Sequence, residues 1–188
     1  LASLYFLLFF GVFSSISFDY HSNVIAACLV PWWMYFLKKE KLTQAGAVLL
    51  LLLVGKENMA LWTVFLCLGM AWEMRQQPKV RNFLLIGTLV SIGYFVLVVK
   101  VLMPAFASEG AYPHFKYSSL GSGFGEAIVY LLTHPLEAFT TLFVNHTGEP
   151  SGDFVKVELH LLLLAAGLPL LLWRPHFLVM LVPIYFQK

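Results

Sequence analysis

Seven apolar runs, separated by short polar segments, are the feature that most constrains how this chain folds. They lie at 1–16, 24–37, 42–54, 59–74, 83–103, 159–173 and 177–186. A helix needs about 20 residues to cross roughly 30 Å of hydrocarbon, and only 83–103 meets that length comfortably. The others must borrow flanking polar residues or be shielded by neighbouring protein. The pattern predicts an all-α fold, a polytopic transmembrane helical bundle with short re-entrant or half-length helices.

The composition agrees with a membrane-embedded chain. Hydrophobic residues make up 60% of the 188 positions and charged residues only 12%, whereas a soluble domain carries about 25% charged residues. The net charge of +2 comes from basic residues in short loops, which argues against nucleic acid and leaves the lipid bilayer as the partner. Cys28 and Cys67 lie within apolar runs, so they suggest neither a disulfide framework nor a metal site.

The segment 42–74 has two interpretations. As one helix it would be about 50 Å long, well beyond the membrane thickness. It would also bury the polar residues 55–58, and a charge at the bilayer centre costs at least about 2.5–3.5 kcal/mol. A turn at 55–58 leaves two short helices but places the basic loops at 38–41, 75–81 and 174 on one face. The positive-inside rule makes that face cytoplasmic, and we therefore predict the turn.

The remaining polar segments then share the opposite, extracytoplasmic face. The longest is 104–158, an extracytoplasmic loop segment in which 124–132 has a helical pattern. Pro135 at a first helical position and Glu137 in the first turn predict a second short helix. We expect both to be outer-face interfacial helices. We also expect residues 1–188 to form a single transmembrane domain that is a fragment of a longer chain.

Two charged constellations on this outer face could carry chemistry. Asp19 and His21 lie at the mouth of a span, where they could bind a metal, relay a proton or contact a sugar. The alternative is a polar interfacial position beside aromatic neighbours. Lys56 and Glu57 interrupt apolar sequence, and intramembrane ionisable residues are functional candidates by default. The alternative interpretation of Lys56 and Glu57 is a structural turn in which the two charges reach water or pair with each other.

A third candidate is the aromatic run that precedes a glycine-rich segment. Tyr112, Lys116 and Tyr117 would suit a sugar or a lipid phosphate, and they would equally suit an interfacial anchor. These three residues join the two constellations as substrate-binding candidates. The candidate ligands for a divalent metal ion are Asp19, His21 and Glu57.

Several short motifs occur in an order that resembles a known family. They are Phe18–Asp19–Tyr20–His21, Pro31 before a basic loop, Lys56–Glu57 after an apolar run, Tyr117 with Leu120–Gly121, the segment 131–136, and Pro183 in the final run. Together they cover most of the chain from Phe18 to Pro183. The order resembles the bacterial membrane family catalogued as domain of unknown function 2079, which is similar to the GT-C membrane glycosyltransferases.

This resemblance implies an enzyme of the bacterial inner (plasma) membrane. GT-C enzymes move a sugar from a polyprenyl-phosphate donor on the non-cytoplasmic side, and an acidic catalytic residue sits in their first outer loop. That loop would precede this chain, so the catalytic residue is expected upstream. Lys56 would offset phosphate charge, while Glu57, Asp19 and His21 would bind a divalent ion or acceptor hydroxyls.

Two other functions are compatible with the same residues. A transporter would place its substrate site at the broken helices around 55–58, although no inverted repeat is evident in the sequence. A non-catalytic membrane scaffold would tolerate simultaneous substitution of Asp19, His21, Lys56 and Glu57. The donor and the acceptor are not determined by these patterns.

Overall fold

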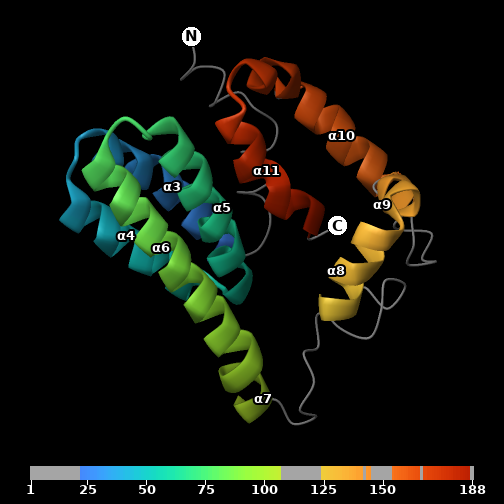
Figure 1. Ribbon diagram of the computed structural model, residues 1–188, viewed down its shortest axis with the longest axis horizontal. Coiled ribbons are helices and arrows are strands. Elements are labelled where there is room, and N and C mark those ends of the chain that lie inside the picture. Colours follow the sequence, from blue (N-terminus) through green and yellow to red (C-terminus); the bar gives the residue numbers. More distant parts are fainter. Residues whose placement is uncertain (1–21, 107–123, 142, 145–153, 166, 187–188) are drawn as a thin grey trace. The chain divides into compact units, whose positions relative to one another are not determined.

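A computed structural model describes residues 22–106, 124–141, 143–144, 154–165 and 167–186. Every described segment of regular structure is a helix, which confirms the predicted all-α class. The chain divides into two compact units, residues 1–99 and 100–188. Figure 1 shows the helices of both units, coloured along the sequence.

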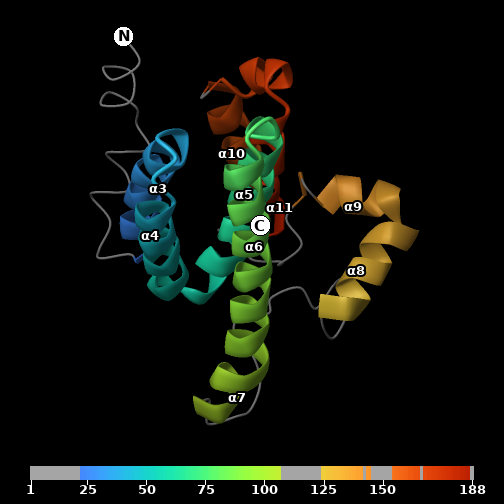
Figure 2. The same cartoon turned by 60° about the vertical axis from the view of Figure 1, so that its left-hand side comes forward.

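Four helices form the described part of the first unit: α3 (Ser22–Lys38), α4 (Leu42–Gly55), α5 (Glu57–Glu73) and α6 (Pro78–Leu97). The main contacts join α3 to α4 and α5 to α6, and α4 also touches α5 and α6. Consecutive helices run in opposite directions, so the α3–α4 and α5–α6 loops lie at the same end of this unit (Figures 1 and 2). The chain turns between α4 and α5, as the sequence predicts.

The α3–α4 loop is short because a Schellman motif ends α3. Glu40 has a φ of 55°, the left-handed conformation that usually selects glycine directly after a helix. The Glu40 N–H donates to the Leu37 carbonyl at 3.0 Å, and the Lys41 N–H donates to the Phe36 carbonyl at 2.9 Å. These bonds satisfy carbonyls left open at the helix end, so the chain reverses within a few residues.

The α5–α6 loop reverses the chain in a similar distance. The Met74 N–H donates to the Met70 carbonyl at 2.8 Å, and the Gln77 N–H donates to the Met74 carbonyl at 2.9 Å. Pro78 occupies the first turn of α6, where its missing N–H is tolerated and its fixed φ suits a helix. Both loops are therefore tight, and both carry basic residues.

A glycine allows α5 and α6 to approach closely. A Cβ atom at Gly87 of α6 would lie 3.3 Å from Cys67 Sγ of α5 and 3.5 Å from Leu49 Cδ2 of α4. Cys67 has no exposed surface, so the sulfur cannot move outward into open space. Small residues at such contacts are typical of helices that pack inside membranes.

The buried hydroxyls near this contact are satisfied by their own helices. Thr63 Oγ1 donates to the Met59 carbonyl at 2.7 Å, and Ser91 Oγ donates to the Gly87 carbonyl at 2.8 Å. Both side chains are fully buried. Because each hydroxyl is paired within its helix, burying it does not leave an unmet hydrogen bond.

α6 continues through a π-helical segment, η1 (Val98–Leu102), into α7 (Met103–Phe106). The uninterrupted helix Pro78–Ala105 has 28 residues and is about 42 Å long. Within the described ranges, it alone is long and apolar enough to cross a membrane; Val24–Lys38 and Leu42–Gly55 are shorter apolar helices. Much of its apolar surface is exposed, for example Leu89 at 69%, unlike that of a soluble core helix.

The described part of the second unit contains α8 (Phe124–Thr133), α9 (Pro135–Thr141), α10 (Val155–Ala165), the 3-10 segment η3 (Leu168–Trp173) and α11 (His176–Phe186). α8 contacts α9, while η3 contacts both α10 and α11. α8 and α9 confirm the two short helices predicted after the glycine-rich segment. The apolar run 159–173 is not one helix, because Gly167 has a φ of 94° and Pro169 cannot donate a backbone hydrogen bond.

We predict that Gly87→Leu pushes α6 away from α5 and lowers the free energy of unfolding by about 1–3 kcal/mol, the usual effect of overpacking. The matched control is Gly93→Leu on the same helix, because a Cβ atom at Gly93 would meet nothing within 4 Å among the described neighbours. Thermal unfolding of both variants in detergent measures the difference. Equal destabilisation of the two would show that the α5–α6 approach at Gly87 is not tight.

Candidate functional site

A single extended residue, Lys56, forms the break between α4 and α5. Its backbone has φ −165° and ψ 154°, with Gly55 ending one helix and Glu57 beginning the next. The Met59 N–H donates to the Lys56 carbonyl at 3.0 Å, which closes the first turn of α5. The Lys56 side chain is half-buried. The junction between α4 and α5 lies at the end of the first unit that is opposite the two basic loops (Figure 2).

Asn58 adds a hydrogen-bonding group beside this break. Its side-chain Oδ1 atom is buried and accepts no hydrogen bond from the described residues. Leaving a buried acceptor unpaired costs about 1–3 kcal/mol, so the position favours a hydroxyl or amide donor. The sequence places Asn58 in the polar interruption but gives no reason to prefer it over Glu57, because burial of one oxygen is a tertiary property.

The other predicted site residues cannot be placed relative to Lys56. Asp19, His21, Tyr112, Lys116 and Tyr117 lie outside the described residues. Glu57 belongs to the first turn of α5, but its side chain is outside the described part. The gathering of these residues with Lys56 therefore stays a prediction, as does their role as metal ligands.

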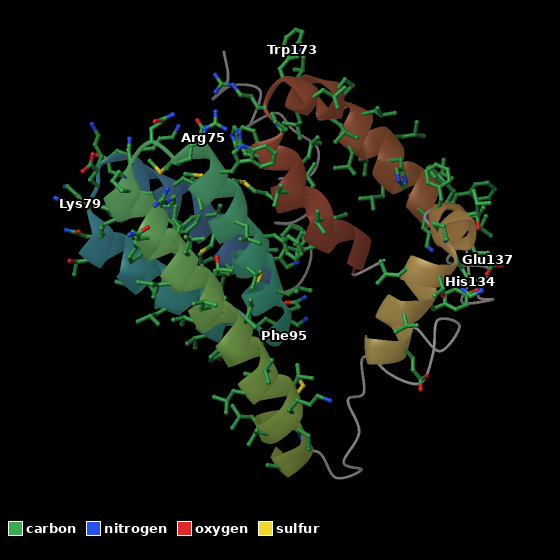
Figure 3. The ribbon with its side chains drawn as sticks, in the orientation of Figure 1. Arg75, Lys79, Phe95, His134, Glu137 and Trp173 are labelled. Carbon is green, nitrogen blue, oxygen red and sulfur yellow. The ribbon has the colours of Figure 1, made fainter. Side chains whose placement is uncertain are left out.

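A second polar cluster occupies the bend between α8 and α9. His134 is the one non-helical residue between the two helices, and its ring stacks on Tyr130 with centroids 4.5 Å apart. The Thr133 hydroxyl lies 2.8 Å from His134 Nδ1. Tyr130 Oη donates to the carboxylate of Glu137 across the bend. Figure 3 shows His134 and Glu137 close together on these helices.

The Thr133 hydroxyl lies between two groups, the Val129 carbonyl at 2.8 Å and His134 Nδ1 at 2.8 Å. The direction of its contact with His134 depends on the tautomer of the ring. The exposed His134 ring and the Glu137 carboxylate both offer the bend hydrogen-bonding groups for hydroxyls.

The sequence pattern did not identify this cluster as a site. In the sequence, Pro135 and Glu137 indicate only the start of a short helix. The available signal was the spacing of Tyr130, His134 and Glu137 at i, i+4 and i+7, which places side chains on one helical face. That signal was obscured because the helix breaks within the interval.

A metal centre finds no support in the described part of the chain. Nowhere in these ranges do three His, Cys, Asp or Glu side chains gather closely enough to hold an ion. His134 and Glu137 supply at most two ligands, which is fewer than the common metal sites require. Asp19, His21 and the Glu57 side chain lie outside the described residues.

The architecture is that of an α-helical membrane protein, with a long, exposed apolar helix and cations concentrated in the loops at one end. Residues 1–187 match the family described as predicted membrane protein (DUF2079), and the chain belongs to that family. This confirms the family that the short motifs resemble, and it places the chain in a membrane. No curated protein and no solved structure matches the chain.

The α8–α9 cluster generates a prediction about pH. The hydrogen bond to Glu137 raises the pKa of Tyr130 above its ordinary value, and desolvation and the Glu137 charge act in the same direction. The contact therefore supports the bend below about pH 10, the ordinary tyrosine value, and its contribution is lost as pH rises through the raised pKa. Titration of ¹³Cζ-labelled tyrosine by NMR measures this pKa, with the Tyr130 signal assigned through Tyr130→Phe.

Glu137→Gln should lower the pKa of Tyr130 toward its ordinary value, because it removes the carboxylate acceptor and its charge. Thr133→Ala is the matched control, since Thr133 contacts His134 and not the Tyr130 phenol. A Tyr130 pKa that stays the same in Glu137→Gln would rule out the bond across the bend.

Proposed function

We propose that this protein is a GT-C-like glycosyltransferase that uses a polyprenyl-phosphate-linked sugar on the extracytoplasmic face. The observation that carries the proposal is the position of Lys56, the extended residue that joins α4 to α5. This junction lies at the end of the first unit opposite both basic loops. If the basic loops are cytoplasmic, Lys56 faces the other side of the membrane. A lipid-linked sugar phosphate would meet it there.

Lys56 and Asn58 offer complementary chemistry to such a donor. An ammonium group offsets phosphate charge, and hydrogen bonds to charged groups are about twice as strong as neutral ones. The buried Asn58 oxygen can accept a hydrogen bond from a sugar hydroxyl. Glu57, Asp19 and His21 remain proposed partners for a divalent ion or for acceptor hydroxyls.

The outer-face position of α8 and α9 is part of the same proposal. Exposed apolar residues recur along both helices at spacings of three and four: Val129, Leu132, Leu136 and Phe139. Such a stripe is typical of an amphipathic helix lying in the membrane interface. Glu126 and Glu137 are acidic, and residues 124–141 contain no Lys or Arg. This composition suits the face away from the positively charged loops.

Transport is the second candidate, and the break between α4 and α5 is the observation that favours it. Helices of 14 and 17 residues extend only about 21 and 26 Å, less than the hydrocarbon thickness. Transporters use interrupted helices of this kind to expose backbone groups to a substrate. The transferase is preferred because the Lys56 cation, near the buried Asn58 acceptor in sequence, suits a sugar phosphate.

We predict that Lys56→Met weakens binding of a polyprenyl-phosphate sugar by about tenfold or more, since a hydrogen bond to a charged group contributes about 1.5–3 kcal/mol. Lys56→Arg keeps the charge and should retain most of the binding. Both are measured with the protein reconstituted in nanodiscs, together with transfer of a radiolabelled sugar to acceptor. If Lys56→Met binds the polyprenyl-phosphate sugar and transfers sugar as well as the wild type does, Lys56 does not contact the phosphate.

The same preparation separates the alternatives. Sugar flux into proteoliposomes without a covalent product would favour the transporter. A wild-type protein with no sugar binding, transfer or flux, whose folding also tolerates substitution of Asp19, His21, Lys56 and Glu57 together, would indicate a scaffold.

We predict that a fluorophore on Leu136→Cys is quenched by brominated lipid in nanodiscs, because this exposed residue belongs to the apolar stripe. The matched control is Glu137→Cys on the same short helix, because Glu137 is also exposed, lies about 100° around the helix from Leu136 on the side away from Phe139, and should remain accessible to a water-soluble quencher. Cys28 and Cys67 are replaced by alanine in both. Water-soluble quenching at both positions would place α9 away from the bilayer, and quenching by neither reagent would mean that protein covers it.

A further inference from the structure

Two loops that are distant in the sequence bring six basic residues to one end of the first unit. The cations lie in or next to the α3–α4 and α5–α6 loops, and all six are exposed: Lys38, Lys39, Lys41, Arg75, Lys79 and Arg81. Arg75 and Lys79 are labelled at this end in Figure 3. We call these six residues the basic end. They are half of the 12 Lys and Arg residues in the chain.

The basic end keeps a clear excess of positive charge. Glu40 and Glu73 are the acidic residues within the same two segments, so six cations face two carboxylates. The excess is larger than the net charge of +2 for the whole sequence. A local field of this sign attracts anions, and a low-dielectric surface beside it strengthens the attraction.

Helix stability does not explain all of these cations. Lys38 lies in the last turn of α3, where a cation interacts favourably with the helix dipole. Lys79 and Arg81 lie at the start of α6, where the same dipole makes a cation unfavourable. Two basic residues at that position therefore point to an interaction outside the helix.

Exposed aromatic residues lie on α3 and α5, close in sequence to the cations of the basic end. Trp32 is 60% exposed and Tyr35 is 48% exposed, and their ring centroids lie 6.5 Å apart about one turn before Lys38. On α5, Trp72 is 44% exposed just before the α5–α6 loop. Amphipathic rings at such positions lie at the level of lipid head groups.

We propose that the basic end binds the anionic phospholipid head groups of the leaflet it faces. Lys and Arg ammonium and guanidinium groups would contact the lipid phosphates, while Trp32, Tyr35 and Trp72 would lie at the boundary with the acyl chains. Clusters of four to eight Lys and Arg next to a transmembrane helix are typical of anionic-lipid recognition. This interaction is independent of the proposed sugar transfer, which concerns the opposite end of the unit.

A lipid fits the pattern better than a soluble polyanion. A polyanion in water needs only the cations, and exposed tryptophans directly beside them would be unexplained. A phospholipid needs both, because its phosphate is joined to a chain that must stay out of water. Membership in a membrane protein family places such lipids within reach of the basic end.

The test compares two identical substitutions on one helix. Lys79→Gln removes a cation of the basic end, and Lys100→Gln removes an exposed cation about 32 Å further along the continuous helix Pro78–Ala105. The full chain is placed in nanodiscs of phosphatidylcholine with phosphatidylglycerol, and native mass spectrometry measures how much phosphatidylglycerol it retains. Lys79→Gln should lower retention about fivefold, which corresponds to about 1 kcal/mol for one cation near the surface. Lys100→Gln should leave it unchanged.

A second variant tests whether charge is the cause. Lys79→Arg should keep wild-type retention, and the combined Arg75→Gln, Lys79→Gln and Arg81→Gln variant should lose nearly all of it. Circular dichroism confirms that each variant folds. Equal effects of Lys79→Gln and Lys100→Gln would overturn the proposal. Full displacement of the lipid by inorganic phosphate or heparin would also overturn it, by showing a site for soluble anions.

Discussion

The close contact between α5 and α6 is the interaction on which the arrangement of the first unit depends. Gly87 presents only a hydrogen where any other residue would press on the buried Cys67 sulfur. In hydrocarbon there is no water to pair polar groups, so packing and internal hydrogen bonds must hold helices together. Thr63 and Ser91 fit this environment because their hydroxyls bond to carbonyls of their own helices. The tight α5–α6 hairpin then fixes where its loop lies.

That hairpin and the α3–α4 hairpin together give the first unit two chemically different ends. Both loops carry cations, and because the chain turns at Lys56 between the hairpins, the loops lie at the same end. Had 42–74 formed one continuous helix, the two basic loops would lie at opposite ends. One extended residue therefore determines the electrostatic asymmetry on which the proposed sites rest.

Several elements could be predicted from the sequence because local rules decide them. The turn at 55–58 follows from helix length and charge, and α9 begins where Pro135 allows a first helical turn. The run 159–173 was harder, since hydrophobicity alone cannot show that Gly167 adopts a positive φ. The Tyr130–Glu137 bond was missed because it crosses a helix break, and the unpaired Asn58 oxygen was missed because burial depends on neighbours from other helices.

The sequence by itself determined that this is an all-helical membrane protein of its family, because continuous apolar runs in lipid satisfy their backbone hydrogen bonds within a helix. It also determined that Lys56 lies in a different loop from the six cations of the basic end. The predicted turn also implied that loops 39–41 and 74–77 share one end and that the α4–α5 junction lies at the other, as the helices show. Only the tertiary structure decided which residues come together, such as Gly87 and Cys67. Which residues meet in space depends on how the helices pack, and close packing at Gly87 is a property of two surfaces that neither helix specifies alone.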